Sequence, residues 1–162
     1  MAAQKTPSRT RAALIVTALI GVFVGLAAAT FDYAEGTSYL SNDPNACVNC
    51  HIMRDQFNSW QLSAHHAHAT CNDCHVPHDL VGKYVTKMDH GYRHSKGFTF
   101  NDFHEPIQIK ESSLRVVENN CVRCHGSFVG DLTIAHAALV GDKVEPRACS
   151  RCHASAGHAA RR

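Results

Sequence analysis

Four copies of the five-residue pattern Cys-x-x-Cys-His use every cysteine in the chain. They occupy residues 47–51, 71–75, 121–125 and 149–153. Two thiols at this spacing can form thioethers to the two vinyl groups of one haem, and the adjacent histidine can bind the iron. The pattern therefore predicts four covalently bound haem c groups. The attachment residues would be Cys47, Cys50, Cys71, Cys74, Cys121, Cys124, Cys149 and Cys152.

Zinc ribbons, redox dithiols and disulfides also use paired cysteines. A four-cysteine zinc site does not require a histidine after every pair. A thioredoxin-type dithiol occurs singly on a βαβ pattern, which this sequence lacks. All three alternatives are therefore disfavoured, and visible absorption would separate a haem protein from a colourless zinc protein.

The amount of polypeptide predicts the fold class. Residues 32–162 leave about 33 residues for each haem, although even a 60-residue chain makes only a marginal domain. We expect a mainly α-helical chain with much irregular structure, wrapped around haems that form its core. A net charge of +2 is too small to indicate a nucleic-acid partner.

The N-terminal region predicts a membrane anchor. Residues 1–11 are basic and would be cytoplasmic, residues 12–31 carry no charge, and residues 32–162 would form the periplasmic haem domain. Twenty helical residues span about 30 Å, the thickness of the hydrocarbon core. Basic residues before the span and acidic ones after it predict a single pass through the cytoplasmic membrane, with the haem domain outside. The alternative is a cleaved signal peptide, although its apolar region is usually shorter.

The second axial ligands of the irons must come from other side chains. The histidines of the motifs, His51, His75, His125 and His153, are the proximal candidates. Met53 could replace His51 at the first haem, but the two cannot face the same way, and the residues alone favour His51. The three histidines of the run 65–68 precede the second motif, and His158 follows the fourth. His136 could be a ligand or a core histidine.

A helix is predicted from Asp79, as its cap, to about His94. One face is apolar, and the other carries Lys83, Lys87, His90 and His94. This basic face could simply be solvated, or it could bind and deprotonate a quinol, which releases two protons with its two electrons. Beyond it we expect an aromatic loop over 95–107 and separate helices over 108–119 and 131–140.

These motifs, taken in order, resemble a known family. The resemblance rests on the N-terminal anchor, Cys-x-x-Cys-His-Ile-Met, Ser-x-His before Cys-Asn-Asp-Cys-His-x-Pro, and a histidine five residues after the last motif. In these features the sequence resembles the NapC/NirT-type membrane tetrahaem quinol dehydrogenases. Within that family the sequence most resembles the small subunits of cytochrome c nitrite reductases. The resemblance implies that the chain oxidises menaquinol and supplies a periplasmic pentahaem subunit that reduces nitrite to ammonium.

The resemblance also implies roles for single residues. Met53 would be the ligand of the first haem, which reverses the preference for His51. His65, or His66 in another register, would reach the fourth haem, and His158 would reach the third, with the second haem completed by the partner subunit. For the quinol site, the best-matched lysine is Lys87, with Lys83 possible, and this sequence offers Asp89 or His94 where some members place an aspartate.

Two other functions are open to a chain with these motifs. A tetrahaem carrier, soluble or anchored, could feed another periplasmic reductase such as nitrate reductase. A soluble shuttle requires cleavage of the anchor and leaves the basic helical face unexplained. Direct nitrite reduction needs an open haem face, which the abundance of histidine disfavours.

Overall fold

The computed structural model describes residues 9–140 and 149–158, with side chains placed for residues 9–129 and 149–158. All regular secondary structure in these described residues is helical, which confirms the predicted fold class. The chain divides into two compact units, Met1–Ser38 and Tyr39–Arg162.

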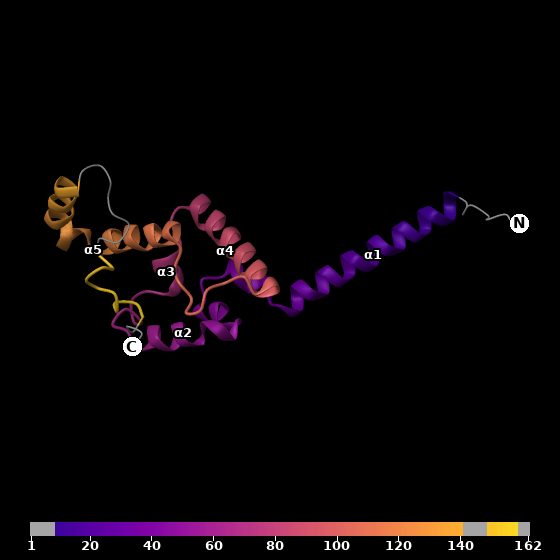
Figure 1. The fold of residues 1–162 in the computed structure, drawn as a ribbon, viewed down its shortest axis with the longest axis horizontal. Coiled ribbons are helices and arrows are strands. Elements are labelled where there is room, and N and C mark those ends of the chain that lie inside the picture. Colours follow the sequence, from indigo (N-terminus) through magenta and orange to yellow (C-terminus); the bar gives the residue numbers. More distant parts are fainter. Residues whose placement is uncertain (1–8, 141–148, 159–162) are drawn as a thin grey trace, which may run out of the picture. The chain divides into compact units, whose positions relative to one another are not determined.

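Helix α1, Arg9–Tyr33, forms most of the first unit (Figure 1). Its 25 residues give a length of about 37 Å, and none of its side chains is buried. Among the described residues, it is the one helix long and apolar enough to cross a membrane. The predicted span over 12–31 lies wholly within it, so the helix is confirmed, and its retention as an anchor stays a prediction.

Short helices carry the first two motifs because local caps start and stop them. The side chain of Asp43 accepts a hydrogen bond from the Asn45 backbone at the start of η2. Thr70 and Asp73 form a reciprocal capping box that begins α3. The elements in this part of the chain are η1 (Gly36–Leu40), η2 (Pro44–Val48), η3 (His51–Met53), α2 (Arg54–Gln61) and α3 (Cys71–His75).

Helix α4, Leu80–Phe100, begins at the predicted cap. Asp79 Oδ1 accepts a 2.6 Å hydrogen bond from the Gly82 backbone N–H. The helix runs past Gly91 and ends at Asn101, whose φ of 53° is left-handed. The prediction of a loop from residue 95 was therefore wrong. The additional turns end where the Asp102 N–H bonds to the Gly97 carbonyl.

Helix α5, Glu111–Val140, is a single helix of 30 residues that contains the third motif. The prediction of two separate helices was wrong because no proline interrupts the intervening stretch, and its glycines lower helical stability without ending the helix. His136 lies in this helix, but its side chain is outside the described side chains. Gly141, which follows the predicted helix over 131–140, lies outside the described residues.

The second unit has very little apolar interior. Within the described residues, the buried apolar side chains are Trp60, Val76 and Leu114, and the buried polar ones are Lys87, Glu118 and Asn120. A folded domain of this size normally buries many more large apolar side chains than this. The polypeptide therefore relies on polar contacts and on whatever fills its interior, as expected if haems form the core.

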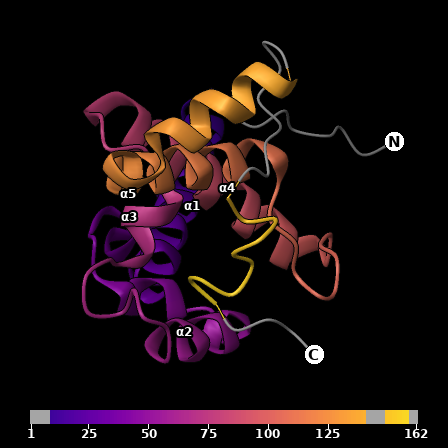
Figure 2. The same ribbon diagram turned by 90° about the vertical axis from the view of Figure 1, so that its left-hand side faces the viewer.

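Two buried polar residues of α5 hold the other motifs in place. The Asn120 amide donates to the carbonyls of Cys74 and Val76, at 3.0 Å each. The Glu118 carboxylate accepts from the backbone N–H of Cys149 at 2.8 Å and of Ser150 at 3.0 Å. Figure 2 shows α3 against α5, with the C-terminal segment passing toward α2. Helix α5 thus carries the third motif and fixes the second and fourth.

Replacing Asp79 by alanine should lower the free energy of unfolding by about 1 kcal/mol, because the Gly82 N–H loses its cap. Asp79→Asn should retain most of the stability. Thermal unfolding of the haem-loaded protein, followed by circular dichroism, measures both variants. Equal losses in the two variants would contradict the capping role.

Replacing Glu118 by alanine should cost about 3 kcal/mol, since two partly buried N–H groups lose a charged acceptor. Glu111→Ala, in the exposed first turn of the same helix, is the matched control and should be nearly neutral.

The contribution of Glu118 should also depend on pH. Burial opposes ionisation, but the hydrogen bonds from Cys149 and Ser150 outweigh it and hold the pKa of the carboxyl below its ordinary value of 4.5. A depressed folded-state pKa gives stability that is present above pH 4.5 and is lost as the pH falls. The difference in stability between wild type and Glu118→Gln should therefore shrink below that pH, and a difference that grows on acidification would contradict this account.

Candidate functional site

The attachment cysteines of consecutive motifs lie next to one another. The thiol of Cys47 is hydrogen bonded to that of Cys71, and the thiol of Cys121 to that of Cys149. Between these pairs, Cys74 lies close enough to Cys121 for the charge of one to affect the pKa of the other. None of the eight cysteines, all of which lie in the described residues, is in a disulfide. The motifs therefore follow one another in space in the order of the sequence.

The ring of His158 lies opposite that of His75, with the ring centroids 6.1 Å apart. His158 Nδ1 is 2.9 Å from the Gln56 carbonyl, which can only accept, so Nδ1 carries the proton and Nε2 keeps its lone pair. Metal-bound histidines show this arrangement, in which the second ring nitrogen donates to a backbone carbonyl. A metal ion about 2 Å from each of two imidazole nitrogens puts the two ring centroids about 6 Å apart.

His75 itself is suited to bind iron at neutral pH. Burial, with smaller effects from the positive charges of His158 and His90, lowers the pKa of His75 to about 4. The imidazole is therefore neutral at pH 7 and offers a lone pair. The pair His75–His158 fits the two axial positions of one haem iron.

A second pair has the same spacing. The rings of His65 and His125 have centroids 6.0 Å apart. His65 Nδ1 is 2.9 Å from the Ala156 carbonyl, so this ring also keeps Nε2 free. The C-terminal segment thus orients one histidine through its backbone and contributes another, His158, through its side chain.

These pairings differ from those that the family resemblance implied. His65 lies at the third motif rather than the fourth, and His158 at the second rather than the third. The physical reason is that the bond of His158 to the Gln56 carbonyl directs its ring to the second motif. His66, the alternative to His65, packs its ring against Trp60 at 4.8 Å. Among residues 9–129 and 149–158, neither His51 nor His153 has a histidine ring opposite it.

At the first motif, two neighbouring residues are candidates for the iron ligand. His51 and Met53 both lie in the single turn η3, His51 exposed and Met53 partly covered. Either side chain could approach an iron from this turn, and the preference for Met53 stays a prediction.

Lys87, on α4, is buried beside the first motif, with only 5% of its surface exposed. Its ammonium donates to the carbonyls of Tyr39, at 3.1 Å, and Ser41. Burial, and then the positive charge of Lys83, lowers the pKa of Lys87, while the nearby Cys47 opposes this. Thioether formation would remove the negative charge of Cys47. Lys83 is partly exposed, with its ammonium 5.9 Å from the Tyr84 ring centroid.

Tyr39 connects Lys87 to His94. Its carbonyl accepts from Lys87, and its hydroxyl is 2.6 Å from His94 Nδ1. Burial, followed by the charges of Cys47 and Cys50, raises the pKa of the Tyr39 hydroxyl to about 12. Seven residues are close to two helical turns, so His94 lies on the same face of α4 as Lys87.

The two other titratable neighbours on α4 are placed differently. His90 stacks on His94 at 5.8 Å, and burial, before the charges of His94 and Arg93, lowers the pKa of His90 to about 4. Asp89 is ion-paired with Arg93. Because Asp89 follows Lys87 by two residues, it lies about 200° around the helix from Lys87. Of the two predicted alternatives, His94 shares the face of Lys87 and Asp89 does not.

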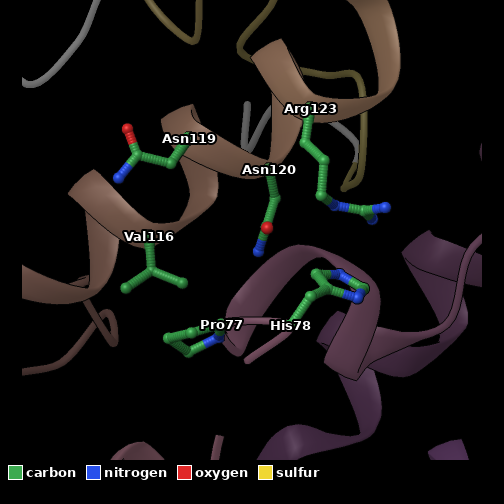
Figure 3. Close-up of a pocket in the computed structure, with 6 residues that line it drawn as sticks. All are labelled: Pro77, His78, Val116, Asn119, Asn120 and Arg123. Carbon is green, nitrogen blue, oxygen red and sulfur yellow. The ribbon is translucent and has the colours of Figure 1, made fainter. Parts of the chain in front are cut away.

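A polar hollow of about 220 Å³ opens between α5 and the segment after α3 (Figure 3). Its lining is Pro77, His78, Val116, Asn119, Asn120 and Arg123. The Asn120 amide reaches across to the backbone on the far side, as the close-up shows. His78 and Arg123 both help to hold the pKa of the Asp73 carboxyl below its usual range, although burial opposes this and the bonds from Thr70 contribute more. The hollow thus belongs to the contact between the second and third motifs.

The sequence interpretation missed Tyr39, Glu118 and Asn120. Glu118 and Asn120 directly precede the third motif, so their position was a possible signal. Their partners are backbone groups of remote residues, which leave no mark in the sequence. Tyr39 lies in a connector that appeared only polar.

Comparison with known proteins places this chain in a family. The sequence profile described as the NapC/NirT cytochrome c family, N-terminal region, matches residues 7–162. The chain is 38% identical over 152 residues to the cytochrome c-type protein NrfH of Wolinella succinogenes, covering 90% of this chain and 83% of that one. It is 31% identical over 151 residues to the cytochrome c nitrite reductase subunit NrfH of Nitratidesulfovibrio vulgaris, covering 93% and 88%.

Two further likenesses agree with these. The cytochrome c-type protein NapC of Escherichia coli is 29% identical over 175 residues, covering 95% of this chain and 85% of that one. A crystal structure of the cytochrome c nitrite reductase NrfHA complex bound to the HQNO inhibitor contains a chain that is 29% identical, with a TM-score of 0.58 and 90% of each chain covered. The predicted resemblance is confirmed, and the chain belongs to the NapC/NirT cytochrome c family.

Proposed function

We propose that this protein is a membrane-anchored tetrahaem cytochrome c that oxidises menaquinol and passes the electrons to the catalytic subunit of a periplasmic nitrite reductase. The NrfH relatives and the NrfHA complex support this partner. The NapC relative makes a nitrate-reductase partner the second candidate. The observation that carries the quinol role is the buried Lys87 beside the first motif, on a helix otherwise poor in buried side chains.

The proposed quinol site consists of Lys87, His94 and Tyr39. Oxidation of a quinol releases two electrons and two protons, and covalently bound haem supplies the one-electron chemistry. A cationic Lys87 can donate a hydrogen bond to a quinol oxygen and thereby favour loss of the quinol's own proton. Burial, and then Arg93, lowers the pKa of His94, so its ring is neutral at pH 7 and can accept that proton. The hydroxyl of Tyr39 orients His94 through Nδ1. The tautomer that can accept the proton is the one in which Nδ1–H donates to the Tyr39 oxygen and Nε2 keeps its lone pair.

Asp89 is the weaker candidate for this role. Its carboxylate is paired with Arg93 and lies away from Lys87 around α4. His94 is hydrogen bonded through Nδ1 to Tyr39, beside Lys87. Its role is therefore proton transfer rather than iron ligation.

The haem sites are proposed from the same geometry. The second haem would have His75 and His158 as axial ligands, and the third His125 and His65. His51 or Met53 would bind the first iron and His153 the fourth. Adjacent cysteines of successive motifs favour a row of haems from the quinol site toward the fourth motif.

Lys87→Ala should slow menaquinol-driven reduction of the detergent-purified protein about 100-fold, since the site loses its cationic donor. Stopped-flow absorption at the haem α-band measures the rate. Lys83→Ala, on the neighbouring turn, is the control and should stay close to wild type. Full reduction by dithionite in both variants would show intact haems. An unchanged rate in Lys87→Ala would contradict the site, and no quinol-driven reduction in wild type would contradict the function.

His158→Ala should convert one low-spin haem to high spin, because the second iron loses a ligand. Electron paramagnetic resonance of the oxidised protein measures the change, in preparations whose mass shows four attached haems. His68→Ala, an exposed neighbour of the predicted ligands, should leave the spectrum unchanged.

A double variant tests the pairing itself. If His75 and His158 bind one iron, then His158→Ala combined with His75→Ala should disturb one haem only. His158→Ala combined with His125→Ala should disturb two. The reverse pattern would restore the pairing implied by the family resemblance.

A further inference from the structure

Helix α4 buries one lysine and leaves its apolar face exposed. Lys87 is 5% exposed, whereas Leu80 and Val81 are each 72% exposed and Met88 is 67% exposed. A surface helix normally buries its apolar stripe against the protein and turns its charged face to water. The outer face of α4 is defined here by its large exposed side chains, Leu80, Val81, Tyr84, Val85, Met88 and Tyr92.

The outer face of α4 is continuous and uncharged. At 100° per residue, its six side chains fall within about 140° of the helical circumference, and no charged residue of α4 lies inside that arc. Charged residues flank it: Lys96 and Asp89 follow on one side and Lys87 precedes on the other. An apolar surface of this kind, bounded by polar residues, indicates contact with another apolar phase.

Bound haem would lie on the opposite side of α4. Lys87, on the inner face, is close enough to Cys47 for that cysteine to affect its pKa, and His90 affects His75 in the same way. The face of α4 that carries Lys87 and His90 is therefore the one turned toward the first and second haem motifs. Haem attached to the cysteines of these motifs would therefore start on the side of α4 opposite its outer face.

The covalent chain limits how far α4 can lie from the end of α1. Lys87 is bonded to the carbonyls of Tyr39 and Ser41, and Tyr39 follows Tyr33, the last residue of α1, by six residues. Six residues extend at most about 22 Å, and a 3₁₀ turn over Gly36–Leu40 shortens this reach. If α1 spans the bilayer, the lipid headgroup region lies within that distance of Tyr39.

We propose that the outer face of α4 lies in the interfacial region of the lipid bilayer, as a second membrane contact beside α1. The chemistry of the face suits this position: aliphatic side chains can enter the acyl boundary, and Tyr84 and Tyr92 belong to the aromatic type enriched at headgroup depth. This contact does not depend on quinol oxidation, because it follows from the exposed side chains and the length of the tether.

A photo-crosslinker placed on the outer face of α4, and at control positions away from it, tests the proposal. Benzoylphenylalanine would replace Val81 or Met88 on the outer face in the full-length, four-haem protein, irradiated in its native membranes. Two controls are Asp89, on a charged flank of α4, and Phe128, an 84% exposed aromatic residue on α5. Mass spectrometry of the purified protein identifies what each position has captured.

We expect lipid adducts at positions 81 and 88, and at most background amounts at 89 and 128. Adducts to a protein subunit at 81 and 88 would overturn the proposal in favour of a subunit interface. Lipid capture at 81 and 88 no greater than at 128 would overturn it as well. A protein that fails to oxidise menaquinol but captures lipid at 81 and 88 would overturn the proposed function and leave the membrane contact standing.

Discussion

The contacts from α5 to the backbone of the other motifs are the interactions on which the second unit depends. Glu118 and Asn120, both buried side chains, each make two hydrogen bonds to groups far away in the sequence. They matter more here than in an ordinary domain because few large apolar side chains are buried among the described residues. Hydrogen bonds fix direction as well as distance, whereas apolar packing is non-directional. A chain that must hold four attachment motifs in register therefore benefits from polar fixation.

Helix α4 separates two environments. Its inner face supplies Lys87 and His94 and, through Tyr39, a connection between them. Its outer face presents aliphatic and aromatic side chains. The same 21 residues can do both because the helical repeat sends neighbouring residues to different sides. The stripe of Leu80, Tyr84 and Met88 was predicted correctly as a pattern, but such a pattern does not reveal whether protein or lipid covers it.

Sequence reasoning succeeded where a short-range signal decides the structure. The Cys-x-x-Cys-His motifs, the uncharged run inside α1 and the cap at Asp79 are each defined by neighbouring residues. It failed where the outcome depends on competition between weak local preferences, as in the helical continuation of α4 beyond residue 95 and of α5 through the third motif. The ring contacts of His65 with His125 and of His158 with His75 also have no local signal, because those rings are oriented by the carbonyls of Ala156 and Gln56. Spatial neighbours more than 90 residues apart leave no local pattern.

The position of His158 beside His75 also bears on how the protein is made. Synthesis proceeds from the N-terminus, so Cys71 and Cys74 are made well before residue 158. Haem could be joined to the second motif while its surroundings are still incomplete. The neighbourhood of His75 closes only when the final few residues arrive and His158 docks on α2. A segment made late in synthesis would therefore complete the surroundings of an early motif, so the second motif cannot reach its final environment before residue 158 has been made.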